Sequence, residues 1–367
     1  MKKTKIIAMY LPQYHCIPEN DEFWGKGFTD WVTVKKAKPL FEGHQQPRVP
    51  LNNNYYDLSI KENVVWQANL AQKAGIYGFG VYHYWFNNEK NLLTKPAEII
   101  RDCEDVKMNY FLAWDNASWV RSWTNVSGNA WSPVADKGMN KNGSSVMVQY
   151  DLGTEIDWEN HFYHVLSHFR NPKYIVENGK PLFIIFNYNK DVELMCSYWD
   201  KLAIKEGFNG MFFVIKHKPG LVVKNGIYQF KYEPLNSGWS KLSLWNRFEE
   251  KFNRMFKMRL RLLKYDYDNI WKSILSNAEN DIDPNILHGA FISYDDTPRR
   301  GRDGKIVCGS SPEKFKNYME QLIAISTKQE KKFIFITAWN EWGEGAYFEP
   351  DIKNGYSYIE NLSKISQ

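Results

Sequence analysis

Short apolar runs that end on polar or aromatic residues recur eight times along the chain. They span residues 5–12, 77–86, 109–116, 181–189, 210–218, 226–234, 288–296 and 332–341. Segments with helical periodicity lie between most of them, at residues 59–74, 155–170, 191–206 and 311–329. Continuous apolar strands are typical of parallel sheets that are buried on both faces. The pattern therefore predicts an α/β fold, and the count of eight favours a closed (β/α)8 TIM barrel over a doubly wound open sheet.

One domain accounts for the whole pattern, so we expect a single catalytic barrel over residues 1–367. The stretch between the sixth and seventh runs is unusually long and predicts a helical insertion around residues 235–285. Within it, residues 245–264 are amphipathic with a basic face. We favour a helix packed on the barrel, and peripheral contact with an anionic membrane is the alternative.

Chemically functional side chains gather at the ends of the eight runs. The carboxyl ends of barrel strands open on one mouth, where loops build the active site. Polar and aromatic groups that converge there suit a ligand with many hydroxyl groups, and we expect Trp85 and Trp114 to line sugar subsites. The full set of expected binding residues at strand ends is Tyr14, His83, Tyr84, Trp85, Trp114, Asp115, Asn187, Tyr232, Asp295 and Asn340.

Two glutamates close the last run, in "FIFITAWNEWGEGAYFEPD" at residues 333–351. A tight loop or a first helical turn would bring Glu341 and Glu344 to the same side of the mouth. Neighbouring carboxyl groups split their pKa values, which leaves one acid and one base near neutral pH, and glycosidic bond cleavage uses such a pair. Trp342, between them, is expected to form a sugar platform or to exclude water. The alternative is an ordinary helix start that favours acidic residues through its dipole.

The same stretch carries a resemblance. "WNEWGEGAYFEPD" is similar to the NEWxEG…EP signature of glycoside hydrolase family 99 and of the related WbsX-like proteins of bacterial polysaccharide gene clusters. Further segments that resemble the WbsX-like group are, in chain order, "AMYLPQYHCIPENDEFWGKGFTDW", "GFGVYHYWFNNEKNLL", "WDNASWVRSW" and "YDDTPRRG". They span nearly the whole chain, and the resemblance implies a (β/α)8 barrel.

The resemblance also implies roles. In family 99 the first Glu of the signature is the base that acts on the sugar 2-hydroxyl and the second is the acid that protonates the leaving oxygen, which here are Glu341 and Glu344. The 2-oxygen then displaces the aglycone, and water opens the resulting 1,2-anhydro sugar with net retention. This route needs a 1,2-trans substrate such as an α-mannoside or α-rhamnoside. Glu349, in the same signature, is expected to contact the substrate. "WDNASW" departs from the family's third-strand pattern, with Ala117 or Ser118 where a Glu is expected.

Composition narrows the partners and the compartment. The 47 basic and 42 acidic residues leave a net charge of +5, too diffuse for a nucleic-acid groove, so we expect no nucleic-acid partner. The 15 Trp, 22 Tyr and 22 Phe suit either an aromatic core or stacking on sugar rings. The four cysteines lie far apart, without metal or disulfide spacing, and the first residues resemble a strand rather than a signal peptide. These features predict a cytoplasmic protein with reduced thiols.

Two clusters of charged or titratable residues have competing interpretations. His161, His164 and His168 lie at helical spacing, which we interpret as the polar edge of a helix rather than a metal site, so no metal and no cofactor are expected. Arg299 and Arg300 follow the seventh run and would either bind a phosphate, a carboxylate or an acidic sugar, or lie in a surface turn.

Three functions from different classes follow. We favour a retaining glycoside hydrolase that acts on an oligosaccharide or polysaccharide. A glycosyltransferase is the second, since WbsX-like proteins are often labelled so, although the chain has no GxGxxG-type phosphate loop and no clear DxD site at a strand end. A carbohydrate-binding protein is the third, and recognition alone gives no reason to pair Glu341 with Glu344.

Overall fold

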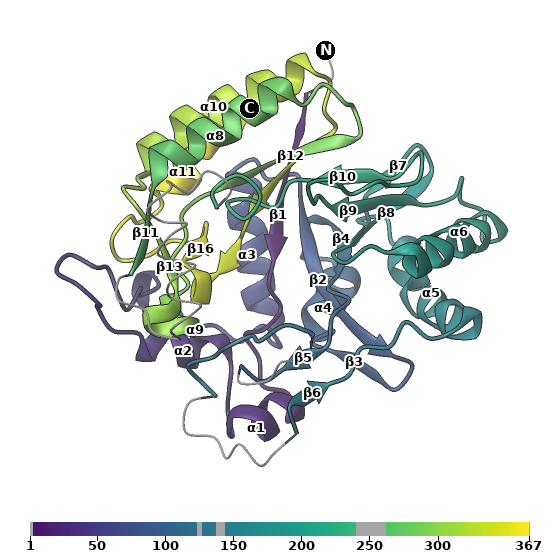
Figure 1. The fold of residues 1–367 in the computed structure, drawn as a ribbon, viewed down its shortest axis with the longest axis horizontal. Coiled ribbons are helices and arrows are strands. Elements are labelled where there is room, and N and C mark those ends of the chain that lie inside the picture. The colour runs from purple at the N-terminus through teal and green to yellow at the C-terminus, as the bar shows by residue number, and fades with distance from the viewer. Residues whose placement is uncertain (1–2, 123–126, 137–143, 240–261, 367) are drawn as a thin grey trace.

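The computed structural model describes residues 3–122, 127–136, 144–239 and 262–366 (Figure 1). In that part of the chain, eight parallel strands form a closed barrel in the order β1, β14, β12, β10, β9, β8, β4 and β2, and β2 pairs again with β1. The barrel strands are β1 (Lys5–Tyr10), β2 (Gly78–Asn87), β4 (Asn109–Trp114), β8 (Lys180–Ile185), β9 (Phe212–Lys216), β10 (Tyr228–Phe230), β12 (Ile286–Phe291) and β14 (Phe333–Thr337). The predicted barrel is confirmed.

Each of the eight predicted runs overlaps one barrel strand. The strands are buried along almost their whole length, as in β8 and β14, because helices cover the outside and side chains fill the inside. Most strands end several residues before the predicted runs do. The polar ends of the runs therefore lie in the loops around the mouth, where they are free to build a site.

The helices that cover the barrel include the four that the periodicity predicts. Their starts have local signals: Thr154 and Asp157 form a capping box at α5, and the side chains of Asn189 and Ser311 cap α6 and α10. Figure 1 shows α8, α10 and α11 packed along one side of the molecule and α5 and α6 together on another. The covering helices are α3 (Lys61–Lys73), α4 (Lys95–Asp102), α5 (Glu155–Phe169), α6 (Lys190–Lys205), α8 (Tyr267–Asn280), α10 (Pro312–Lys328) and α11 (Ser357–Ser366).

Short elements surround the mouth of the barrel. Helices α2 (Asp30–Lys36) and α9 (Thr297–Arg300) both contact the 3-10 turn η3 (Trp342–Glu344), which lies beyond the end of β14. Thus three segments far apart in sequence meet beside the two glutamates. The other short elements are α1 (Pro18–Trp24), η1 (Leu51–Asn53), β3 (Lys90–Leu92), β5 (Trp119–Val120), β6 (Val146–Val148), β7 (Val176–Glu177), β11 (Leu263–Asp266), η2 (Gly301–Asp303), β13 (Lys305–Cys308), β15 (Asn340–Glu341) and β16 (Ala346–Tyr347).

The insertion predicted around residues 235–285 is only partly described. Its second half forms strand β11, which pairs with β13, and helix α8. Residues 240–261 lie outside the described residues, and with them most of the amphipathic segment 245–264, so the membrane contact stays a prediction. None of the helices in the described ranges is long and apolar enough to cross a membrane.

Candidate active site

A pocket of ≈ 470 Å³ opens at the carboxyl ends of the barrel strands. Its lining includes residues in or just beyond each of the eight barrel strands, so the whole circumference of the barrel contributes to it. The expected site residues that line it are Tyr84, Asp115, Tyr232, Arg299, Glu341 and Glu344.

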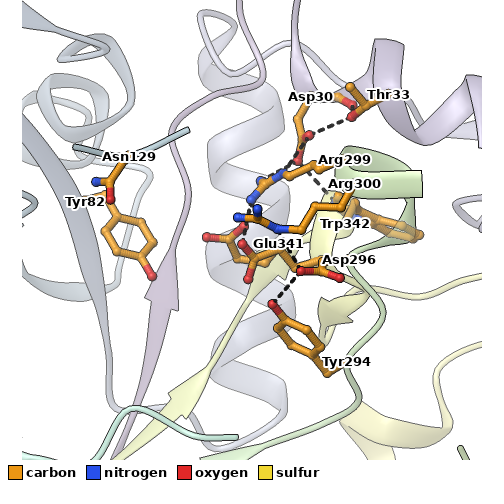
Figure 2. A network of polar contacts seen from close by, with 12 residues as sticks. Asp30, Thr33, Tyr82, Asn129, Tyr294, Asp296, Arg299, Arg300, Glu341 and Trp342 are labelled. Atoms are coloured by element: carbon orange, nitrogen blue, oxygen red, sulfur yellow. Dashed lines mark hydrogen bonds and ion pairs between the residues drawn. The ribbon is translucent and has the colours of Figure 1, made fainter. Parts of the chain in front are cut away.

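One arginine joins the two glutamates. Arg299, in α9, donates through Nη2 to Glu341 Oε2 at 2.9 Å and through Nη1 to Glu344 Oε1 at 2.8 Å. Figure 2 shows Arg299 and Glu341 pointing toward one another across the end of β14. The two carboxylates therefore lie on the same side of the pocket, held by a single buried guanidinium.

Asp30 completes this cluster from the first helical turn of α2. Its carboxylate is fully buried and accepts from Arg299 Nη2 at 2.9 Å and Nε at 3.3 Å (Figure 2). It also accepts from the backbone N–H of Gly343 at 3.2 Å. A Cβ at position 343 would lie 2.5 Å from both Arg299 Nε and Asp30 Oδ1, which explains the glycine between the two glutamates. We call Asp30, Arg299, Glu341 and Glu344 the glutamate side of the pocket.

Tyr14 and Asn340 position the loop that carries the glutamates. The amide of Asn340 exchanges two hydrogen bonds with the backbone of Leu11, at 2.7 and 2.9 Å, and so ties the loop to the end of β1. The Tyr14 hydroxyl donates to the Asn340 carbonyl at 2.6 Å and accepts from the backbone N–H of Trp342 at 3.1 Å. Neither side chain lines the pocket, so both act on the site from behind it.

The electrostatics of the glutamates are unequal. Burial, together with the negative charges of Glu344 and Asp30, raises the pKa of Glu341 to about 8 although Arg299 lowers it. The Glu341 side chain is only 6% exposed, whereas the Glu344 side chain is 23% exposed and reaches the open part of the pocket. Burial therefore favours the protonated form of Glu341, and Glu344 lies on the solvent side of the pair.

A further carboxyl group, that of Glu349, lies behind the loop that carries Glu341 and Glu344. It accepts from Trp342 Nε1 at 2.6 Å, from the Tyr56 hydroxyl at 2.7 Å and from Gln67 Nε2 at 2.6 Å. Burial raises the pKa of Glu349 to about 7. Glu349 does not line the pocket, so its contacts fix Trp342 rather than a ligand.

The opposite wall is formed by Asp115, Phe186 and Lys216, which we call the β8 side because they follow or end β4, β8 and β9. Counted around the closed barrel, β8 lies opposite β14, so this side faces the glutamate side. Asp115 accepts from Asn129 Nδ2 at 3.0 and 3.1 Å, and burial raises its pKa to about 6.

Several expected binding residues lie outside the pocket, contrary to our expectation. Trp85 and Trp114 pack on His161 of α5, and Trp114 Nε1 donates to the Trp85 carbonyl at 2.8 Å. His83 likewise points outward, with its Nε2 2.9 Å from His161 Nε2. The reason is the alternation of side chains along a strand: Tyr82 and Tyr84 face the pocket, so His83 and Trp85 face the helices.

Three more of the expected binding residues contact other protein groups and do not line the pocket, namely Trp342, Asn187 and Asp295. Trp342 is 1% exposed and stacks on Tyr347 at 3.7 Å, so it is part of the core rather than a sugar platform. Asn187 pairs with Asn116 and links the loops after β4 and β8. The Asp295 carboxylate is buried and accepts from His44, Gln46 and Thr297, at 2.9, 2.7 and 2.6 Å.

The three histidines of the HxxHxxxH pattern lie on α5 and have separate partners. His161 contacts His83, His164 Nε2 lies 2.7 Å from Asn91 Nδ2, and His168 Nδ1 lies 2.9 Å from the Tyr110 hydroxyl. Within the described ranges, no three His, Cys, Asp or Glu side chains are arranged to hold a metal ion.

Several residues of the site were not predicted as such, and four of them show why. Asp30 lies in the "GFTDW" segment, which carried the resemblance but no assigned role, and Lys216 was one strand-end residue among many. Trp131 lies 4.6 Å from the Arg299 guanidinium carbon, and Trp239 lines the pocket near Tyr294. Both tryptophans lie in irregular segments, where hydrophobic periodicity has no signal to offer.

The family model described as "Glycosyltransferase WbsX" matches residues 6–362, from β1 into α11. The chain belongs to this family. The predicted resemblance is thereby confirmed, and the WbsX match includes both sides of the pocket. The protein WxcX of Xanthomonas campestris pv. campestris strain B100, which is described as uncharacterized, is 28% identical over 97% of this chain and 48% of its own length. The chain spans about half the length of the curated relatives that it matches.

Two solved structures share the fold of this WbsX family member at low sequence identity. A glycoside hydrolase family 99 endo-α-mannosidase from Bacteroides thetaiotaomicron is 12% identical, with a TM-score of 0.53 over 98% of this chain and 94% of that one. A "glycoside hydrolase-like protein" is 11% identical, with a TM-score of 0.61 over 100% and 95%. At this identity the likeness establishes the barrel fold.

Proposed function

We propose that the protein is a retaining glycoside hydrolase that cleaves a 1,2-trans linkage, α-manno or α-rhamno configured, within a complex polysaccharide. The observation that carries the proposal is the pair Glu341 and Glu344, bridged by Arg299 at the wall of a polar and aromatic pocket. Support for the sugar configuration comes from the glutamate signature and from the similar fold of an endo-α-mannosidase.

The burial of the glutamates supports separate roles for them. The general acid must reach the leaving oxygen and later the incoming water, which suits the more exposed Glu344. The base must reach a hydroxyl deeper in the pocket, which suits Glu341. Its raised pKa makes Glu341, when ionised, a stronger base than an exposed carboxylate.

In the first step, Glu341 takes the proton of the sugar 2-hydroxyl and the 2-oxygen attacks C1. The bond from C1 to the leaving oxygen breaks, and Glu344 gives its proton to that oxygen. In the second step, Glu344 takes a proton from water while the water oxygen attacks C1. The bond between C1 and the 2-oxygen breaks, and Glu341 returns its proton to the 2-oxygen, which restores both glutamates and retains the anomeric configuration.

The positions of other carboxylates favour this route over a covalent glycosyl-enzyme. Asp295 has no place at the pocket wall because its oxygens are bonded to His44, Gln46 and Thr297. Asp115 lies on the β8 side, across the barrel from Glu344. A nucleophile and its acid would need to flank one bond, about 5 Å apart.

A glycosyltransferase is the second candidate, favoured by the description of the family model. The same pocket would then admit an acceptor hydroxyl in place of water. The two candidates differ in whether an activated donor is needed.

The test uses a defined α-mannose-containing or α-rhamnose-containing oligosaccharide, with and without nucleotide sugars. We expect cleavage without a nucleotide, α-configured product at first release by proton NMR, and no reaction of the 2-deoxy analogue. Glu341→Gln and Glu344→Gln should each lower turnover by about 10²–10⁴-fold while the thermal midpoint changes little. Full turnover by both variants would contradict the proposal, and product formation only with a nucleotide sugar would establish the transferase.

A further inference from the structure

Lys216 differs from the two arginines that line the pocket in the described part of the chain. Its ammonium group lies 5.3 Å from the centre of the Phe186 ring and 5.5 Å from that of Tyr232. Among the residues that the structure describes, Lys216 Nζ has no hydrogen-bond or ion-pair partner. The other two cations at the pocket are committed: Arg299 to the glutamate side, and Arg300 to Asp296 at 3.0 Å.

The surroundings of Lys216 make a free ammonium group unfavourable. Burial lowers its pKa, and the negative charges of Asp115 and Glu344 offset this only in part. Two aromatic rings limit the access of water from the side, and they offer only weak electrostatic compensation in return. An anionic group that entered the pocket would restore a full charge partner.

Asp115 supplies the complementary half of the β8 side. Asn129 Nδ2 donates to both of its oxygens, which leaves further lone pairs of Asp115 directed to other donors. Phe186 follows the strand between those of Asp115 and Lys216 and lines the pocket between them. A sugar residue with a carboxylate and neighbouring hydroxyls matches this order of cation, apolar ring and hydrogen-bond acceptor.

We propose that Lys216 makes the protein select an acidic glycan, with the ammonium group binding the carboxylate of a uronic acid residue and Asp115 accepting from its hydroxyls. The inference rests on the proposed function, since it names the substrate class of the same pocket. One ammonium group balances one carboxylate. The diphosphate of a nucleotide sugar would bring more negative charge into a pocket that already contains Asp115, Glu341 and Glu344.

The test measures binding, with no turnover needed. Methyl β-D-glucuronide and methyl β-D-glucoside are titrated into the full chain and followed by ligand-observed NMR, with UDP as a third probe. We expect the glucuronide to bind about tenfold more tightly than the glucoside, because a charge-assisted hydrogen bond distinguishes them. The preference should fall as the NaCl concentration rises.

Three variants locate the preference. Lys216→Met keeps an unbranched stem between the two rings but loses the charge, and it should abolish the preference for the glucuronide. Lys216→Arg keeps the charge and should retain most of that preference. Lys218→Met is the matched control, because Lys218 is exposed two positions further along and does not line the pocket. Thermal melting of each variant establishes that it is folded. The salt dependence, measured on the unmodified protein, needs no variant.

The proposal is overturned by equal binding of the two sugars, by absent binding of the glucuronide, or by a preference that survives Lys216→Met. Tighter binding of UDP than of the glucuronide, lost in Lys216→Met, would overturn it in favour of a nucleotide site. None of these results depends on Glu341 or Glu344 transferring a proton. A failed preference therefore leaves the proposed cleavage standing, and inactive glutamate variants leave the binding result standing.

Discussion

The glutamate side and the β8 side of the pocket differ in how far their polar groups are bonded to one another. Arg299 joins Asp30, Glu341 and Glu344 through contacts of 2.9, 2.9 and 2.8 Å. On the β8 side, Asp115 is held by one amide, and Lys216 has no hydrogen-bond or ion-pair partner in the described part of the chain. Groups that transfer protons must be placed before the substrate arrives, whereas groups that recognise it are most useful when they are unpaired. The contrast separates a side for chemistry from a side for recognition.

The largest expected effect is the loss of stability when the glutamate side loses its arginine. Arg299→Met would leave three carboxylates buried together without their cation, and we expect a loss of about 3–5 kcal/mol in the free energy of unfolding, measured in urea. Arg300→Met is the matched control, because the Arg300 side chain is 41% exposed and pairs with one carboxylate, Asp296. We expect it to lose about 1 kcal/mol or less. Equal losses in the two variants would contradict the special role of Arg299.

The next prediction concerns tryptophans near the two sides. Trp114, next to Asp115, is 1% exposed, so Trp114→Ala should lower the free energy of unfolding by about 3–5 kcal/mol. Trp131 is partly buried and lines the pocket over Arg299. Trp131→Ala should change stability by only about 1 kcal/mol but weaken sugar binding about tenfold. Melting curves and ligand titrations of both variants measure the two effects. Weaker sugar binding with little loss of stability in Trp114→Ala would show that Trp114 lines the pocket.

A smaller effect is expected for Gly343→Ala. The added methyl group would overlap Arg299 Nε and Asp30 Oδ1, and we expect a loss of about 1–3 kcal/mol together with reduced turnover. The double variant Gly343→Ala with Arg299→Met should lose less than the sum of the two single changes, because both disturb the same contacts. Additive losses would show that the methyl group acts elsewhere.

The smallest expected effect is on the β8 side and concerns how the stability of the protein depends on pH. Burial raises the pKa of Asp115 from 3.8 to about 6, so the folded protein binds this proton more tightly than the unfolded chain does. The associated stability is present below pH 3.8 and is lost as the pH rises through about 6. Asp115→Asn has no such loss, so between those pH values its stability should rise relative to the unmodified protein, by about 1 kcal/mol or less. Urea unfolding at several pH values measures this difference, and a parallel pH dependence would contradict it.

The fold was predictable because its signals are local. Each strand has an apolar run of its own, and the four predicted helices have their own periodicity and end signals, as at Thr154 and Ser311. The glutamate pair was predictable for the same reason, since three positions of spacing after a strand place both residues on one side. The positions of Trp85 and Trp114 were not predictable in this way, because successive side chains alternate between the two faces of a strand. Both Trp114 and Asp115 were expected in the site, but only Asp115 lines the pocket, and its neighbour Trp114 packs in the core.

The sequence by itself determined the barrel, the WbsX-like signature and the two glutamates beyond the last strand, because each depends on neighbouring residues. Only the tertiary structure decided what holds and faces those glutamates. Asp30 and Arg299 are 269 positions apart, and no local sequence pattern predicts that α2 and α9 both contact η3. Likewise, Lys216 and Glu344 become opposite walls of one pocket only when β2 pairs with β1 and closes the barrel. When the barrel closes, strands that are distant in sequence come to face one another across it. Which residues face one another therefore depends on all eight strands and not on any local segment.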